Sequence, residues 1–339
     1  MKKRLFALLL ASLLLAGCTV PGAPARQRYT ATFLDVFDTV TTIVGYADSE
    51  AAFTQAAQAI HAELLRYHQL FDIYNPYEGI TNLRDINDAA GGEALQVDPA
   101  ILELLKSCKE YFRLTGGRVN AAMGSVLKLW HDAREDAYDD PLNAYLPDQT
   151  KLEEAARHTN FDGVILDEEN CTVRIADPDL RLDVGAIAKG WATQRAAENA
   201  PAGFLISVGG NVCATGPKEG GAAWVVGIQN PDGGDYLHTV YVEKGCVVTS
   251  GDYQRTFPVE GKFYHHIIDP DTLYPSEYFR SVSVICGDSG LADALSTALF
   301  VLPLAEGMAL AEKCGAEAMW LHTDGTRSYT PGFEKLIRT

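Results

Sequence analysis

Several features that define other classes of protein are missing from this sequence. It contains no internal repeat and no low-complexity segment. It has no CxxC motif, and most of the six cysteines after Cys18 lie within apolar runs. We therefore predict that these six are small buried hydrophobic residues, with a disulfide framework as the alternative. They are at positions 108, 171, 213, 246, 286 and 314.

No apolar run is long enough to cross a bilayer as a helix. The longest, residues 5–15, has about a dozen residues and follows Lys2, Lys3 and Arg4, which predicts a signal peptide over residues 1–17. Cys18 follows small residues, as the acylated cysteine of a bacterial lipoprotein does. We therefore predict a lipidated Cys18, a linker over 18–28 and one folded domain over 29–339. Ordinary secretion, with Cys18 unmodified, is the alternative.

Basic residues are also scarce, with 28 Lys+Arg against 45 Asp+Glu and a net charge of −17. Removal of the three basic residues of the signal leaves 25 against 45, or −20. Such a charge argues against nucleic acid as a partner. It also repels anionic lipid, which leaves acyl chains on Cys18 as the expected membrane attachment. The expected location is extracytoplasmic.

The remaining chain alternates short β-branched runs with Ala-rich stretches, which predicts an α+β fold with mixed sheets and packed helices. Its length suits one large domain or two intimate lobes. Helices are expected over residues 49–68, 99–114, 186–199, 291–302 and 304–314. Strands are expected over residues 36–44, 163–166, 172–175, 204–208, 224–228, 239–242, 246–249, 263–268 and 282–285.

One candidate site lies at a strand-to-helix junction over residues 181–191. Asp183 precedes a glycine turn, and Lys189 falls in the first turn of the expected helix. The amide groups and positive dipole end of a helix N-terminus attract phosphate, and Lys189 adds a positive charge. An ordinary turn with a solvated lysine is the alternative.

A second candidate lies on the apolar helix over residues 291–302. Asp293 and Thr297 are four residues apart and share a face. A buried carboxylate needs a partner, and Mg²⁺ suits two hard oxygen ligands together with substrate phosphate. The alternative is a capping or ion-paired aspartate beside a threonine bonded to the preceding turn.

Two glycine-containing segments interrupt strand-like sequence, at residues 207–213 and 249–253. Glycine there allows close approach of a ligand, although a plain hairpin turn is the alternative. Further on, His265 and His266 lie in an expected strand and should face opposite sides. One of them is expected to be an acid–base residue, and zinc is not indicated.

In this order, these segments resemble the ApbE family of FAD:protein FMN transferases, which are commonly periplasmic or surface lipoproteins. The resemblance covers nearly all of the mature chain. It rests on residues 37–39, 183–190, 208–211, 249–253, 265–270 and 292–297. The sequence departs from the usual family pattern at Phe37-Asp38, where Met-Gly is commoner, and at Leu273, where glycine is usual.

The resemblance implies an FAD and Mg²⁺ site between two lobes. Asp293 and Thr297 would bind Mg²⁺ together with the carbonyl of Ala186. His266 would be the acid–base residue, with His265 in reserve and Asp252 or Asp269 sharing its role. The residues implied to bind FAD are Thr39, Tyr74, Met123, Gly124, Asp183, Lys189, Gly209, Gly210, Asn211, Ser250 and Gly251.

The implied reaction moves FMN from FAD to a Thr or Ser hydroxyl of an acceptor protein and releases AMP. Mg²⁺ would neutralise charge on the pyrophosphate. No residue pattern marks a nucleophile held by a base, so no covalent enzyme intermediate is expected. The acceptor would be an FMN-binding domain of a membrane electron-transfer complex. An FAD pyrophosphatase and a non-catalytic FAD-binding lipoprotein are the alternatives.

Overall fold

A computed structural model describes residues 26–338, so the predicted signal peptide and Cys18 lie outside the described residues. The predicted α+β fold is confirmed. Its centre is an eight-stranded antiparallel sheet in the order β1-β2-β6-β7-β10-β13-β14-β15. The strands are β1 (Gln27–Val36), β2 (Thr39–Ala47), β6 (Phe204–Val208), β7 (Asn211–Ala214), β10 (Gly245–Gly251), β13 (Phe279–Cys286), β14 (Glu317–His322) and β15 (Arg327–Tyr329).

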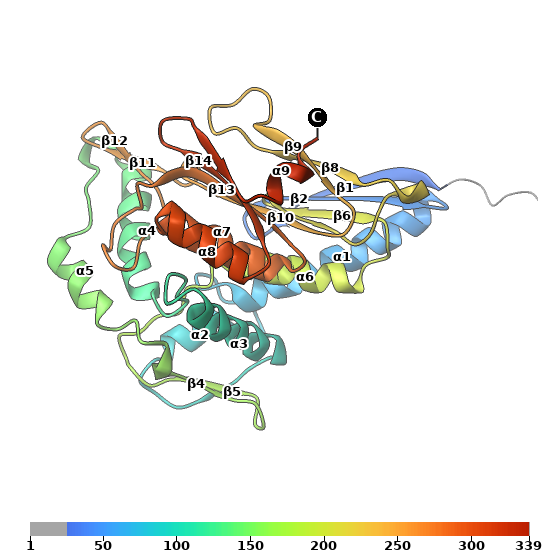
Figure 1. Ribbon diagram of the computed structural model, residues 1–339. Helices are drawn as coiled ribbons and strands as arrows, with labels where there is room; N and C mark the ends of the chain where they lie inside the picture. The colour runs from blue at the N-terminus through green and yellow to red at the C-terminus, as the bar shows by residue number, and fades with distance from the viewer. Residues whose placement is uncertain (1–25, 339) are drawn as a thin grey trace, which may run out of the picture.

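Helices cover one face of this sheet, and a hairpin and a short helix cover the other (Figure 1). The first group is α1 (Glu50–Phe71), α6 (Ala188–Asn199), α7 (Ser289–Val301) and α8 (Leu304–Lys313). The second is β8 (Trp224–Ile228), β9 (His238–Val242) and α9 (Phe333–Leu336). Strands such as β6 alternate fully and partly buried residues because successive side chains point to opposite faces of the sheet.

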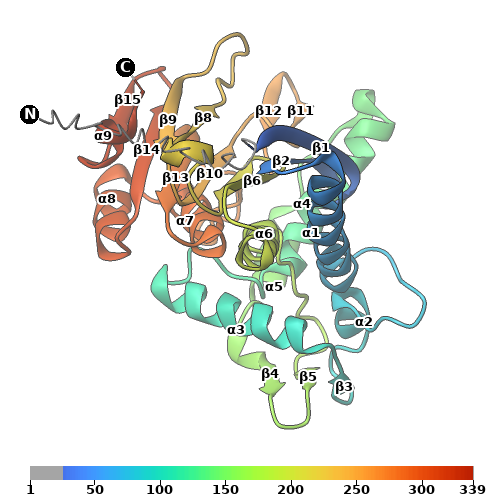
Figure 2. The ribbon, with the colours of Figure 1, turned by 90° about the vertical axis from the view of Figure 1, so that its right-hand side faces the viewer.

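Residues 72–187 form a second lobe, the lower part of which lies beneath the helices of the first (Figure 2). It contains α2 (Leu83–Asp88), α3 (Pro99–Leu114), α4 (Gly124–Asp139), α5 (Gln149–Ala156) and the small sheet of β3 (Leu95–Gln96), β5 (Thr172–Ile175) and β4 (Val164–Asp167). One apolar core continues from Leu104 and Val173 in this lobe to Leu299 on α7. The two lobes are therefore closely packed together. Within residues 26–338, no helix has both the length and the apolar character needed to span a membrane.

Two expected strands differ from the structure. The segment expected as a strand over residues 36–44 contains the turn between β1 and β2, where Phe37 and Asp38 have φ of 53° and 51°. Two positive φ values are typical of tight hairpin turns, but glycine or asparagine usually marks them, and here neither does. The strand expected over 263–268 is only β12 (Lys262–Tyr264), paired with β11 (Phe257–Val259).

Candidate active site

A pocket lies between the two lobes, and most of the site residues predicted from the sequence line it. Its wall includes Thr39, Tyr74, Met123, Asp183, Ala186, Lys189, Gly209, Asn211, Ser250, Gly251, His266, Asp293 and Thr297. Four predicted residues are not part of this wall: Gly124, Gly210, Asp252 and Asp269. Segments that are far apart in the sequence therefore meet here.

The most buried acid of the pocket is Asp293, on α7, with 5% of its surface exposed. Its Oδ2 accepts a hydrogen bond of 2.8 Å from the backbone N–H of Gly190. Burial raises the pKa of this carboxyl, while Lys189 and the Gly190 amide favour its charged form. The cap of α7 is Asp288, which accepts from the amide of Leu291, so Asp293 does not have the capping role considered above.

Two further oxygens of the pocket wall have no hydrogen-bond partner among residues 26–338. Thr297 lies one turn after Asp293 on the same face of α7, and its hydroxyl makes no hydrogen bond within residues 26–338. The carbonyl of Ala186 also accepts none from the described residues, because the amide of Gly190, four residues later, donates to Asp293 instead. A carboxylate, a hydroxyl and a carbonyl are the hard donors that Mg²⁺ takes, so these residues fit the predicted ion.

Close packing of α6 against α7 makes this arrangement possible. A Cβ atom on Gly190 would lie 2.3 Å from the carbonyl oxygen of Ser289 and 2.4 Å from Cβ of Asp293. Only glycine allows the two helices to approach this closely. The approach is what brings the Gly190 amide to the Asp293 carboxylate.

The hairpin that joins β6 to β7 also lines the pocket. The two alternatives considered for residues 207–213, a hairpin turn and a ligand-binding segment, therefore both apply. Gly209 has φ of +56°, and a Cβ there would lie 2.6 Å from Oγ1 of Thr39. Asn211, 2% exposed, favours the charged form of the neighbouring Asp293. Its Nδ2 nevertheless has no hydrogen-bond partner of normal geometry within the described chain.

The two histidines follow β12 instead of lying within a strand, and both line the pocket. The strand alternation on which the expectation of opposite faces rested therefore does not apply to them, and their different roles follow from their hydrogen bonds. Buried His265 contacts the carbonyl of Ser276 through Nε2 at 2.9 Å and accepts from the amide of Ile267 through Nδ1. These partners require a proton on Nε2 and occupy both ring nitrogens. His265 is thus a structural residue of this loop.

His266 has the opposite tautomer. Its Nδ1 lies 3.2 Å from the carbonyl of Gln254, which can only accept, so the proton sits on Nδ1. Nε2 makes no hydrogen bond to residues 26–338 and can take a proton from a ligand. Burial, with the positive charges of Arg255 and Lys189, lowers the pKa of His266 to about 3. The imidazole is therefore neutral at physiological pH, as a general base must be.

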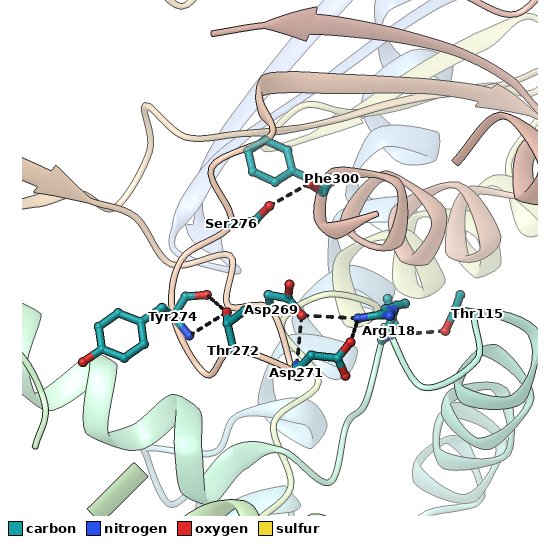
Figure 3. Close-up of polar contacts among 9 residues, drawn as sticks. Thr115, Arg118, Asp269, Asp271, Thr272, Tyr274, Ser276 and Phe300 are labelled. Carbon is teal, nitrogen blue, oxygen red and sulfur yellow. Dashed lines mark hydrogen bonds and ion pairs between the residues drawn. The ribbon is translucent and has the colours of Figure 1, made fainter. Parts of the chain in front are cut away.

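Asp269 and Asp252 are each held by an arginine. Figure 3 shows Arg118 of the second lobe between Asp269 and Asp271, and its Nη1 lies 3.4 Å from Oδ1 of Asp269. Asp252 lies 3.6 Å from Arg280, and its pKa is raised by burial against the opposing effect of that arginine. These ion pairs indicate that both carboxylates shape the loops around the pocket.

The loop of Figure 3 also contains Leu273, where the family pattern has glycine. Leu273 has φ of +63° and is 9% exposed. Its carbonyl accepts a 2.9 Å hydrogen bond from Nε1 of Trp130 on α4. This leucine therefore adopts the left-handed conformation usually left to glycine, and its side chain belongs to an apolar cluster that also contains Trp130 of α4 and Phe257 of β11.

The glycines outside the pocket wall have structural reasons to be there. Gly124, the first residue of α4, donates its amide to the carbonyl of Arg181, and a Cβ would lie 2.5 Å from that oxygen. This contact holds Met123 in the wall. Gly210 has φ of +94° and completes the β6–β7 turn.

Several pocket residues were not predicted from the sequence. Arg255 lines the pocket with φ of +50° and has no ion pair within the described residues. His131 and Arg134 come from α4, and the ring of His131 stacks on Tyr74 at a centroid distance of 4.8 Å. Arg255 follows the glycine block at 249–253, which could have indicated it. The α4 residues had no signal because α4 itself was not predicted.

Taken together, the fold and the pocket define an α+β protein with a phosphoryl-transfer type of site. Oxygen atoms of Asp293, Thr297 and Ala186 lie in one pocket with the cations Lys189 and Arg255 and the neutral His266. The ApbE family profile matches residues 37–320, and the chain belongs to this family.

Proteins of known name and structure agree with this assignment. The chain is 32% identical to the FAD:protein FMN transferase of Treponema pallidum over 96% of this chain and 93% of that protein. It is also 32% identical to the one of Klebsiella pneumoniae over 78% and 79% of the two chains. The crystal structure of the ApbE protein of Thermotoga maritima matches with a TM-score of 0.81 and 31% identity, over 92% of this chain and all of that one.

Proposed function

We propose that this chain is an FAD:protein FMN transferase, which moves FMN from FAD to a Thr or Ser hydroxyl of an acceptor protein and releases AMP. The observation that carries the proposal is one pocket in which buried Asp293 and a neutral His266 face the same space. A protein that only binds FAD has no evident need for both groups. Membership of the ApbE family supports the same reaction.

The proposed metal ligands are Asp293, Thr297 and the carbonyl of Ala186. When Mg²⁺ is bound, it supplies positive charge beside the pyrophosphate of FAD. Lys189 and Arg255 also line the pocket, and their charges favour an anionic substrate. FAD itself is the substrate and not a resident cofactor.

In the proposed step, the acceptor hydroxyl attacks the phosphorus nearer the flavin. The bond from that phosphorus to the bridging oxygen breaks, and AMP leaves with this oxygen. His266 takes the hydroxyl proton on Nε2, because its Nδ1 already carries a proton directed at Gln254. Asp252 and Asp269 would act indirectly, by fixing the loops that hold His266.

We further propose that the protein is exported and anchored outside the cytoplasm through acyl chains on Cys18. The basic start, the short apolar run and the small residues before Cys18 support this location. The acceptor would then be an FMN-binding domain exposed on the same side of the membrane.

Mass spectrometry of an acceptor domain tests the proposed reaction. The purified chain is incubated with FAD, Mg²⁺ and an FMN-binding domain that contains the acceptor hydroxyl. We expect the acceptor to gain one FMN and the solution to gain one AMP, only with Mg²⁺. Asp293→Asn, which keeps the shape and removes the charge, should abolish labelling, and Glu312→Gln on the exposed part of α8 should not.

Two other results would replace the proposal. Free FMN and AMP without a labelled acceptor would assign a pyrophosphatase. Tight binding of FAD that stays intact with Mg²⁺ and acceptor present would assign a carrier.

A further inference from the structure

Three cysteines from three neighbouring strands lie side by side in the central sheet. Cys246 on β10 is paired in register with Cys213 on β7 and with Cys286 on β13. Directly opposite residues of antiparallel strands have their side chains on the same face. The three thiols therefore form a row, and the described chain shows all of them as free thiols.

Within this row, only one pair has its sulfur atoms in contact. Sγ of Cys246 lies 2.7 Å from Sγ of Cys213. Cys286 instead directs its sulfur at the carbonyl of Asp288, at 3.1 Å. Opposite residues of an antiparallel pair have Cα atoms roughly 4.5–5.5 Å apart, within the range that a disulfide spans. The register of β7 and β10 therefore places Cys213 and Cys246 at a Cα separation that a disulfide can span.

We propose that Cys213 and Cys246 form a cross-strand disulfide when the chain folds in an oxidising environment. The two thiols lose two protons and two electrons as the sulfur–sulfur bond forms. The electrons reduce the disulfide of an oxidant, either oxidised glutathione or a thiol–disulfide oxidoreductase, to two thiols. Both cysteines are buried in the folded chain, at 4% and 0% exposure, so the bond forms during folding.

This bond would join the strands that form part of the active site. Asn211 is two residues before Cys213 on β7, and Ser250 and Gly251 follow Cys246 on β10. The bond closes a loop of 33 positions that contains the β8–β9 hairpin. A crosslink of this kind restricts the unfolded chain and so stabilises the fold. The proposal does not depend on the reaction that the pocket performs.

Peptide mapping after refolding tests the proposal. The full-length chain is reduced, unfolded, refolded with a mixture of reduced and oxidised glutathione, alkylated in denaturant and digested. We expect a linked peptide that joins Cys213 to Cys246 and is lighter than the two thiol peptides by two hydrogens. Cys286→Ser, changed at the neighbouring position of the same row, should keep this product.

Stability supplies a second measurement. The oxidised wild-type chain should melt several degrees above the chain refolded under reducing conditions, and Cys246→Ser should show no such difference. Full alkylation of both cysteines after oxidative refolding would overturn the proposal. So would a dominant link from Cys246 to Cys286. The wild-type peptide map decides the question even where a variant fails to fold.

Discussion

The protonation of one imidazole sets the pH range of the proposed reaction. Burial and nearby cations lower the pKa of His266 from 6.5 to about 3, so the neutral base persists well below pH 6.5. We expect the acid limb of kcat/KM to lie below pH 6, because kcat/KM follows the free enzyme. His266→Gln should lower kcat/KM by about 10²- to 10⁴-fold.

A pH profile of kcat/KM for both proteins checks this prediction. An acid limb at pH 6.5 or above that disappears in His266→Gln would contradict the environment described for this histidine.

The lowered pKa of His266 also affects the stability of the fold. Between pH 6.5 and about 3 this imidazole is protonated in the unfolded chain but neutral in the folded chain. The free energy of unfolding therefore decreases as the pH falls through this range.

Leu273 provides a test of backbone strain against side-chain burial. Leu273→Gly and Leu273→Ala both remove a buried side chain, at a cost of about 2–5 kcal/mol. Glycine also relieves the left-handed conformation, which costs other residues about 1–2 kcal/mol. We therefore expect the alanine variant to be less stable than the glycine variant by about 1 kcal/mol, the reverse of the usual order.

Urea denaturation of the two Leu273 variants measures this difference. If the glycine variant unfolds first, the left-handed conformation at position 273 is not a source of strain. The wild type should remain more stable than both, because the lost burial exceeds the relieved strain.

At the scale of single residues, the sequence predicted those pocket residues whose partners lie close to them in the chain. Asp293 and Thr297 were found because a spacing of four places them on one helix face. Arg255 and His131 were not, since their place in the pocket depends on how distant segments pack. The role of Asp269 likewise depends on Arg118, which is distant in sequence and contacts it only in the folded chain.

Among the elements, the contact between α6 and α7 controls the proposed metal ligands. Gly190→Ala would bring a methyl group to within 2.3 Å of the Ser289 carbonyl and must push the helices apart. We expect a loss of about 1–3 kcal/mol in the free energy of unfolding, as in other overpacked cores. We also expect Mg²⁺-dependent activity to fall, because the Gly190 amide would move away from Asp293.

Gly287→Ala is the matched control, because nothing lies within 4 Å of a Cβ at that position. Thermal melts and Mg²⁺ titrations of activity should separate the two variants. If Gly190→Ala matches the wild type in both measurements, the close packing does not position Asp293.

Element prediction succeeded where local signals agree. The helix α3 has the bounds expected from the sequence, since Asp98 caps it and Pro99 occupies its first turn. The helix α4 was missed because it begins after Met123 without a side-chain cap. The strand β7 was absorbed into a predicted turn, although its pairing with β6 across two glycines is the local hairpin given as the alternative for residues 207–213.

For the whole molecule, the position of the pocket between two lobes predicts how ligands affect stability. Ligands that bind only the folded chain stabilise it by about 2.7 kcal/mol at a concentration 100-fold above Kd. FAD and Mg²⁺ together should raise the melting temperature by more than the sum of their separate effects, because the proposed ligands would hold the ion beside the pyrophosphate.

Differential scanning fluorimetry measures this coupling. Asp293→Asn should keep part of the shift caused by FAD alone and lose the extra shift, while Glu312→Gln should behave as the wild type. Simple additivity in the wild-type chain would show that the ion and FAD do not meet in this pocket.

The arrangement of lobes was predictable in outline, since the length and composition indicated one large domain or two intimate lobes. Which segments would face each other was not, because the insertion of residues 72–187 between α1 and α6 has no linker or change of composition to mark it.

The contact of Arg118 with Asp269 and Asp271 has a consequence for how this protein family can vary. The arginine belongs to the second lobe, whereas both acids belong to the loop that follows the two histidines. A chimera that takes residues 72–187 from a relative would separate these partners and leave a histidine loop without its arginine. We expect positions 118, 269 and 271 to change together during evolution, so that the residue at 118 in one lobe predicts the residues at 269 and 271 in the other.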